Sequence, residues 1–341
     1  MRHHLTALQF VLRSVLEKHS VPRGARELRM KLPGGEARAD VYFPNNRRPR
    51  GTVLFIHGMA PRGHRDPRVI NIVRTFADCG FITAAPLFEE IAALEVRKKS
   101  ADDAADMIRL LCRDRRICPG GRISLFGPSF SGGVALRAAS LPETSELVRA
   151  VCTIGTLGHI ESAWRFLLGQ EDIDEYGAMI LLKNFAHHSV GRKKDLIRAF
   201  ELAALDGSYE PGELRVPAHL KTMSAHDREL FIRFRSDAEF RLEHLRRILE
   251  RAGDLMKTYS IIPYLDGLKA KTTLIHGCDD KVIPPSESMI LYSRLKTLGI
   301  DCRLEITPLI SHGASSFTPG VVPKAFSLIG AFAHFFKNAT D

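Results

Sequence analysis

The chain has 341 residues, of which 45% are hydrophobic and 26% charged, a composition that suits a globular protein and excludes a disordered one. No uninterrupted apolar run approaches the roughly 20 residues that span a bilayer, and the six cysteines form neither a CxxC pair nor a metal-binding spacing, so we expect a cytoplasmic protein with reduced thiols. The net charge of +10 comes without a zinc knuckle, an RRM-like aromatic signature or a phosphate loop, so no nucleic-acid partner is expected.

An amphipathic helix is predicted at the start of the chain, over residues 3–19. Apolar residues recur there at helical spacing: Leu5, Leu8, Leu12, Val15 and Leu16. We expect this stripe to pack on the rest of the protein or on a partner. Because Arg2, Arg13 and Lys18 accompany the stripe, peripheral contact with a membrane surface is the alternative.

Two short strands joined by a tight turn are predicted next. Residues 27–32 and 37–43 have strand character, and Pro33-Gly34-Gly35 between them is a hairpin-turn signal. We expect the apolar positions of the second strand, at every other residue from Ala37, to face the core.

From Gly51 the chain alternates between buried strands and helices. Strands are predicted over 52–56, 81–85, 122–126, 148–154, 271–275 and 302–307. Helices are predicted over 67–79, from an N-cap at Ser100 to about 113, and over 132–139, 289–298 and 322–336. This alternation is typical of a mostly parallel, doubly wound sheet, so we expect an α/β fold.

The alternation is interrupted once, between about Gly158 and Tyr264, where the sequence has helical periodicity and no strong buried strand. We interpret this stretch as a helical cap inserted into the sheet domain. The predicted organisation is therefore an N-terminal helix at 1–25, a core formed by 26–157 and 264–341, and a cap at 158–263.

The strongest chemical signal is a serine between a buried strand and a helix. Ser129 is flanked by Gly127 and Ser131, and a nucleophile elbow needs small residues at these two positions because strand and helix approach closely there. The turn would expose the Ser129 hydroxyl at the start of a helix. A rival register with Ser131 as the nucleophile is less favoured, because Gly127 ends the strand directly.

Two further groups follow strand ends in the order that a catalytic triad needs. Asp279 and Asp280 come after the strand at 271–275, where a carboxylate can orient and stabilise a histidine. His312 lies in a loop after the last strand, beside Gly313, and is suited to act as the general base.

An oxyanion hole is expected after the first buried strand, which ends at His57-Gly58. The backbone N–H groups of Met59 and Phe130 are the predicted donors. We expect His57 to brace this loop rather than to act as a base.

The arrangement resembles the α/β-hydrolase superfamily over roughly residues 26–338. The resemblance is carried by four motifs: His57-Gly58, the elbow at Gly127–Gly133, the loop at Gly277–Pro285, and Ser311–Gly313. It implies a triad of Ser129, Asp280 and His312, since the acid in this superfamily usually stands three residues after the glycine. Ser131 departs from the commoner elbow glycine, and the loop at 60–68 lacks a glycine-rich oxyanion pattern, which favours a capped lysophospholipase- or dienelactone-hydrolase-like relative.

The predicted function is that of a serine hydrolase that cleaves a carboxylic ester or thioester through an acyl-enzyme. This chemistry requires no metal or organic cofactor, and the expected partner is a small-molecule ester. An acyltransferase with the same triad and a non-catalytic ligand-binding protein are the alternatives. Two sets of residues bear on the substrate: apolar cap residues that could line a pocket (Trp164, Phe166, Leu167, Leu168 and Met179) and basic loop residues that could meet an anionic group (Arg62, His64, Arg65 and Arg68).

Overall fold

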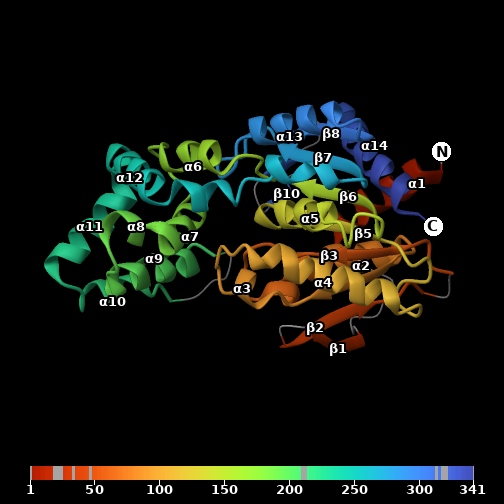
Figure 1. Ribbon diagram of the computed structural model, residues 1–341, viewed down its shortest axis with the longest axis horizontal. Coiled ribbons are helices and arrows are strands. Elements are labelled where there is room, and N and C mark those ends of the chain that lie inside the picture. Colours follow the sequence, from red (N-terminus) through yellow and green to blue (C-terminus); the bar gives the residue numbers. More distant parts are fainter. Residues whose placement is uncertain are drawn as a thin grey trace.

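A single eight-stranded sheet organises the protein (Figure 1). The computed structural model describes residues 2–17, 26–32, 35–45, 48–208, 213–311, 314–315 and 322–340. The strand order is β1-β2-β4-β3-β5-β6-β7-β8, and every neighbouring pair from β4 to β8 is parallel. The strands span Arg26–Leu32 (β1), Gly35–Tyr42 (β2), Thr52–Phe55 (β3), Ile82–Pro86 (β4), Ile123–Pro128 (β5), Val148–Ile154 (β6), Lys271–Gly277 (β7) and Cys302–Thr307 (β8).

The predicted hairpin forms the antiparallel edge of this sheet. Strand β1 pairs with β2 from Arg26↔Val41 to Leu32↔Gly35, and β2 then pairs antiparallel with β4. Pro33 and Gly34 of the predicted turn lie outside the described residues. The mixed but mostly parallel sheet confirms the predicted fold class.

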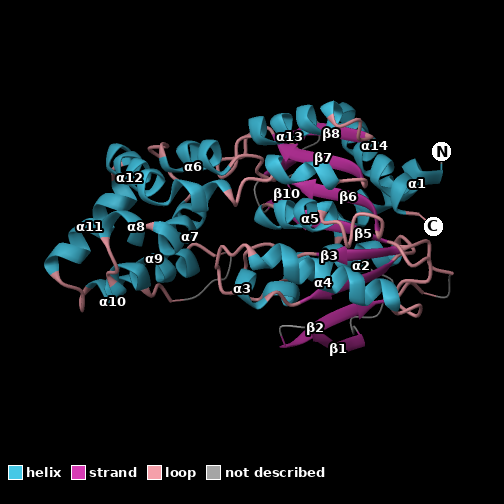
Figure 2. Cartoon of the chain, viewed as in Figure 1, coloured by secondary structure: helices cyan, strands magenta, loops and turns pink. Residues whose placement is uncertain are grey.

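Helices cover both faces of the sheet, as Figure 2 shows. Successive residues of β3 point to opposite faces of the sheet and belong to different apolar clusters. Val53 packs in the cluster on the first face, and Leu54 packs in the cluster on the second face. The first face is covered by α2 (Pro67–Asp78) and α14 (Val322–Ala339), and the second by α4 (Lys99–Arg113), α5 (Phe130–Ser140) and α13 (Pro285–Thr297). Burial on both sides explains why these strands consist of continuous apolar runs.

The N-terminal helix α1 (Arg2–Leu16) packs beside α14 and α2, but not through the face predicted from the sequence. Its buried residues are Thr6, Ala7, Phe10 and Val11. The Phe10 ring lies 4.6 Å from that of Phe76 and 4.9 Å from that of Phe332. The predicted stripe from Leu5 to Leu16 is exposed instead, because the helix carries two apolar arcs and the one with the phenylalanine packs.

Helix α4 also differs from its prediction. It begins at Lys99, so Ser100 lies within its first turn rather than at the N-cap. The Ser100 hydroxyl is buried and has no hydrogen-bond partner among the described residues.

A group of helices interrupts the sheet between β6 and β7, as the sequence predicted. These helices lie beyond one end of the sheet in Figure 1, coloured green to teal. They are α6 (Ile160–Leu168), α7 (Glu175–Phe185), α8 (His187–Val190), α9 (Lys194–Asp206), α10 (Val216–Leu220), α11 (Ala225–Ser236) and α12 (Ala238–Lys257). Asp237 separates α11 from α12, and its carboxylate caps α12 by accepting a hydrogen bond from the Phe240 N–H.

A buried carboxylate holds the outgoing connection to the cap helices. Glu287, at the start of α13, accepts hydrogen bonds from the backbone N–H groups of Gly158 (2.9 Å) and His159 (2.7 Å). The returning chain passes alongside, where the Ile261 N–H donates to the Gly158 carbonyl at 2.8 Å. The two connections are therefore tied together at the point where they leave the sheet.

Shorter elements are also present: the helix α3 (Glu89–Ala92), the 3-10 helices η1 (Gly63–Arg65) and η2 (Ile262–Gly267), and the small strands β9 (Ile310–Ser311) and β10 (Ala314–Ser315). All six cysteines are described, and each is a thiol rather than part of a disulfide; five of them are buried. Within the described residues, no helix is both long and apolar enough to cross a membrane.

A buried arginine joins two helix ends inside the cap. Arg241 on α12 is fully buried and donates to the carbonyls of Leu168 (2.8 Å) and Gln170 at the end of α6. It also donates to the carbonyls of Phe234 (3.2 Å) and Arg235 (3.1 Å) at the end of α11. Terminal helix carbonyls have no partner within their own helix and carry partial negative charge, so this cation satisfies both ends.

We predict that Arg241→Leu lowers the free energy of unfolding by about 3 kcal/mol or more, because buried carbonyls that lose their donor cost about 1–3 kcal/mol each. The matched control Arg246→Leu removes an exposed arginine on the same helix that pairs with Glu250, and it should cost about 0.5 kcal/mol. Urea denaturation followed by circular dichroism measures both values. Equal losses in the two variants would contradict the assigned role of Arg241.

Candidate active site

The turn from β5 to α5 holds Ser129 in a strained conformation. Its φ of 54° and ψ of −131° lie in a region that residues other than glycine rarely occupy. A Cβ atom at Gly127 would lie 2.5 Å from the carbonyl oxygen of Ser131, and one at Gly132 would lie 1.8 Å from Oγ1 of Thr156. These approaches explain why the turn needs glycine at both positions, and they are the geometry expected for a nucleophile elbow.

The two candidate serines have different surroundings. Ser131 is fully buried, and its hydroxyl donates a hydrogen bond to the His57 carbonyl. Ser129 is half-buried and lines the large pocket described below. The geometry therefore favours Ser129 as the residue that meets a substrate.

Met59 and Phe130, the two residues predicted to form an oxyanion hole, both line the same pocket. Met59 follows β3, and Phe130 is the first residue of α5, so the Phe130 N–H has no acceptor within its helix. Strands β3 and β5 are neighbours in the sheet, which brings the two residues together although they are far apart in the sequence. Gly58 lines the pocket between them.

His57 is fully buried and makes two contacts with the backbone around this loop. Its Nδ1 lies 2.9 Å from the Gly58 carbonyl, and its Nε2 accepts a hydrogen bond from the Phe88 N–H at 3.0 Å. Nδ1 therefore carries the proton of a neutral imidazole. Burial lowers the pKa of His57 to about 4, which keeps the ring uncharged at neutral pH.

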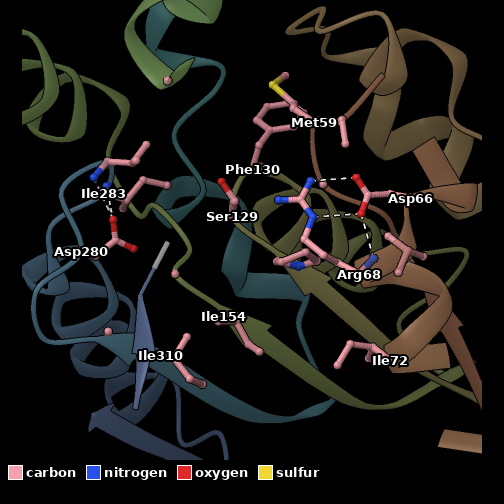
Figure 3. A pocket seen from close by; sticks show the side chains of 18 of the residues that line it. Met59, Asp66, Arg68, Ile72, Ser129, Phe130, Ile154, Asp280, Ile283 and Ile310 are labelled. Carbon is pink, nitrogen blue, oxygen red and sulfur yellow. Dashed lines mark hydrogen bonds and ion pairs between the residues drawn. The ribbon is translucent and has the colours of Figure 1, made fainter. Parts of the chain in front are cut away.

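Asp280 lies in the loop after β7 and is buried, whereas Asp279 is exposed. Oδ1 of Asp280 accepts hydrogen bonds from the N–H groups of Val282 (2.8 Å) and Ile283 (2.9 Å), as Figure 3 shows in part. These bonds fix the carboxylate at the pocket wall. Of the two aspartates, Asp280 is the one that lines the pocket, and its role as the acid of a triad remains a prediction from the sequence.

His312 lies outside the described residues, as does the following Gly313. The last strand of the main sheet before it, β8, is parallel to β7 and pairs with it from Thr272↔Cys302 to Gly277↔Thr307. The role of His312 as general base remains a prediction from the sequence.

A pocket of about 850 Å³ joins these groups. Ser129, Phe130, Met59 and Asp280 all line it, and Figure 3 shows Ser129 between Asp280 on one side and Arg68 on the other. The cap contributes apolar residues to its wall: Ile160, Ala163, Trp164, Leu167, Ile180 and Leu181.

Of the cap residues predicted from the sequence, Trp164 and Leu167 line the pocket. Leu168 and Met179 are fully buried elsewhere in the apolar core, and Phe166 is also not part of the wall. Helical packing and pocket lining require the same apolar side chains, so the sequence could not separate the two groups.

No protein-family model matches this sequence, and no curated protein is similar to it in sequence. Solved structures do match. The chain superimposes over 96% of its length on acylaminoacyl peptidase from Pyrococcus horikoshii, with a TM-score of 0.55 and 16% identity, and it spans 44% of that protein. A puromycin-hydrolysing peptidase from Mycobacterium tuberculosis matches over 93% of this chain, with a TM-score of 0.54 and 17% identity, and the chain spans 39% of that protein. Dipeptidyl peptidase 4 from Porphyromonas gingivalis matches over 94% of this chain, with a TM-score of 0.53 and 12% identity, and the chain spans 37% of that protein.

The chain has the α/β-hydrolase fold. It spans less than half the length of the three structures, and the low identity makes the likeness one of fold. The pocket lies at the carboxyl ends of the parallel strands, where proteins with open α/β sheets bind their ligands.

The guanidinium of Arg68 lies at this pocket. Arg68, in the first turn of α2, lines the pocket and donates from Nε (2.9 Å) and Nη2 (2.7 Å) to the two carboxylate oxygens of Asp66. Asp66 also caps α2 by accepting a hydrogen bond from the Arg68 N–H. Burial would raise the pKa of Asp66, but the hydrogen bonds from Arg68 bring it below its ordinary value, so the pair stays ionised.

The other basic residues of this loop have different surroundings. Arg65 donates to Asp40 and Glu27, away from the pocket, and Arg62 is exposed and does not line the pocket. His64 is buried beside Asp40, and burial lowers its pKa. Of the four residues predicted to meet an anionic group, only Arg68 is in position to do so.

Sequence reasoning missed two residues of the site. The signal for Asp66 is the Asp-Pro-Arg sequence at the start of a helix, which allows one carboxylate to cap the helix and to hold the arginine. Tyr176 on α7 donates its hydroxyl proton to the Met59 carbonyl, which connects the cap to the loop of the expected oxyanion hole. Nothing in the sequence indicated this contact, because the two residues lie on different elements.

The burial of neutral His57 gives the protein a specific pH dependence. The folded pKa of about 4 lies below the ordinary value of 6.5, so the unfolded chain binds more protons between these values. The stability that neutral His57 contributes is therefore fully present above pH 6.5 and is lost as the pH falls toward 4, by about 3 kcal/mol in total.

Urea denaturation from pH 7 to 4 measures this dependence. His57→Gln, which cannot titrate, should show a smaller decrease in unfolding free energy over the same range. Identical decreases in wild type and variant would mean that His57 is charged in the folded protein.

Proposed function

We propose that the chain is a serine hydrolase that cleaves a carboxylic ester or thioester through an acyl-enzyme, with Ser129, Asp280 and His312 as the triad. The observation that carries the proposal is the conformation of Ser129: a positive φ at the tip of a strand–helix turn, beside a pocket that also contains Asp280. Such strain costs about 1–3 kcal/mol, and it is typical of sites where it serves chemistry.

The proposed mechanism uses only protein groups and water. His312 takes the proton of the Ser129 hydroxyl as Oγ attacks the substrate carbonyl, and Asp280 stabilises the resulting imidazolium. The N–H groups of Met59 and Phe130 donate hydrogen bonds to the oxyanion. His312 then protonates the leaving alcohol or thiol, and in the second half-reaction it activates a water that releases the acid and restores Ser129.

The substrate is proposed to combine an apolar part with an anionic group. The apolar part would bind between Trp164, Leu167 and Ile180 of the cap. The anionic group would meet Arg68, whose guanidinium is held in place by Asp66. A pocket of about 850 Å³ has room for a drug-sized molecule, since such sites usually measure 300–1,000 Å³.

Labelling with a fluorescent fluorophosphonate tests the proposal. The wild-type protein should be labelled, Ser129→Ala should not, and Ser131→Ala should retain labelling if it folds. Hydrolysis of a graded set of p-nitrophenyl esters, beside matched anilides, then separates esterase from peptidase activity. Product analysis with added alcohols separates hydrolysis from acyl transfer.

Each outcome is decisive. Labelling that disappears only in Ser131→Ala would move the nucleophile to that residue. A folded wild-type protein that is never labelled would favour the alternative of a ligand-binding protein. Anilide cleavage as fast as ester cleavage would replace the proposed ester substrate with a peptide-like one.

We predict that Arg68→Gln raises the KM for anionic esters about tenfold relative to neutral esters of the same length, with little change in kcat. Loss of one charge-assisted hydrogen bond at a partly exposed site costs about 1.4 kcal/mol, which corresponds to this factor. Arg62→Gln, on the same loop but outside the pocket wall, is the matched control. An unchanged ratio of the two KM values in Arg68→Gln would remove the anionic group from the proposed substrate.

A further inference from the structure

Helix α1 presents a continuous apolar stripe to solvent. Its five residues are between 38% and 61% exposed, and they make up five of the eleven large hydrophobic residues found exposed in the described parts of the chain: Leu5, Leu8, Leu12, Val15 and Leu16. At 3.6 residues per turn they occupy an arc of roughly 100° along the helix. A concentration of this kind on one helix is unusual for a surface that faces only water.

The orientation of the stripe is fixed by the opposite face of α1. Phe10 is buried among the aromatic rings of Phe76, Phe332 and Phe336. Rotating the helix to bury the stripe would expose this ring. The packed arc therefore holds the second apolar arc outward.

Arginines border the stripe at its N-terminal end. Arg2, Arg48 and Arg50 line a surface pocket of about 450 Å³ together with Leu5 of the stripe. Arg50 is held there, because its Nη1 donates to Oγ1 of Thr6 at 2.7 Å. Three cations beside an apolar stripe match a surface that is apolar inside and anionic at its boundary.

We propose that α1 docks this face on an anionic lipid bilayer. Leu5, Leu8 and Leu12 insert between the lipids, and Arg2 and Arg48 bind phosphate-bearing headgroups at the rim. A second copy of the chain is the other occupant that the test below distinguishes, and a face bordered by three arginines is complementary to an anionic surface rather than to itself. Two contributions favour such docking: the burial of apolar area, and an electrostatic attraction to anionic lipids of about 1 kcal/mol for each basic residue near the lipid surface.

The docking face is continuous with the pocket that contains Ser129. Val15 belongs to the exposed stripe and also lines that pocket, together with Val11 and Ser14 of the same helix. A docked protein would therefore have one wall of its pocket at the lipid surface. The docking itself does not depend on the proposed hydrolase activity.

Sedimentation with vesicles tests the inference on the full chain. The vesicles contain phosphatidylcholine alone or an equimolar mixture with phosphatidylglycerol. We expect the wild-type protein to sediment with the anionic vesicles and at least about tenfold less with the neutral ones, and to be released by about 1 M salt, where the screening length is about 3 Å.

Two variants separate the contributions, and a third is the control. Leu5→Gln/Leu8→Gln/Leu12→Gln and Arg2→Gln/Arg48→Gln should each reduce sedimentation with anionic vesicles at least about tenfold. Ile232→Gln/Arg228→Gln changes an exposed apolar and an exposed basic residue on α11, at the far end of the cap in Figure 1, and should bind like wild type. The arginine variant leaves the helix packing untouched, so it keeps the test valid should the leucine variant fold poorly.

Several results would overturn the inference. These are no sedimentation of the wild-type protein, equal binding of the control and the leucine variant, and a dimer in solution that the leucine variant abolishes while no vesicles are bound. Fluorophosphonate labelling without vesicles reports on Ser129 separately. Labelled protein that ignores vesicles would reject only the docking, and vesicle-bound protein that is never labelled would reject only the proposed enzymatic function.

Discussion

The site depends on how closely strand β5 and helix α5 approach each other at Ser129. A side chain at Gly127 would collide with the backbone of Ser131, so the turn exists only because that position has no Cβ atom. The turn is held by hydrogen bonds from the Ser129 N–H to the Ile154 carbonyl (2.7 Å) and from Oγ1 of Thr156 to the Ser129 carbonyl (3.0 Å). The same contacts that maintain the strained φ also fix where the hydroxyl and the first N–H of α5 point.

The parallel sheet brings the other residues of the candidate site together. Met59, Ser129 and Asp280 are separated by scores of residues, yet each follows the carboxyl end of its strand, and these ends lie along one edge. The cap then closes the space above that edge with apolar side chains such as Trp164 and Leu167. The position of the candidate site therefore follows from strand direction together with one insertion.

Much of this architecture could be predicted, because buried parallel strands leave continuous apolar runs. Strands β6 and β8 have the predicted bounds, and the insertion falls where the strand pattern stops. The wrong prediction for the N-terminal helix required a choice between two similar apolar surfaces of one helix. Helix α1 has two apolar arcs, and only the structure shows that Phe10, not Leu8 or Leu12, is buried.

Polar contacts inside the fold were also beyond sequence reasoning. Arg241 and Glu287 look like ordinary surface residues of charged helices, and only tertiary packing places them against helix ends and backbone amides. Arg68 could be named from its loop, but its selection over Arg65 depended on which acidic residue each one reaches. Patterns along the chain define which residues are apolar, and they contain little information about partners distant in sequence.

The attachment of the cap has a consequence for how such a protein can change over evolutionary time. Because Gly158 and Ile261 are hydrogen-bonded neighbours, the ends of the inserted segment are already as close as the ends of a short loop. A segment with adjoining ends can be shortened, lengthened or exchanged for another without altering the register of β6 and β7. The sheet can thus keep its serine turn while successive insertions at this one junction give it new specificities.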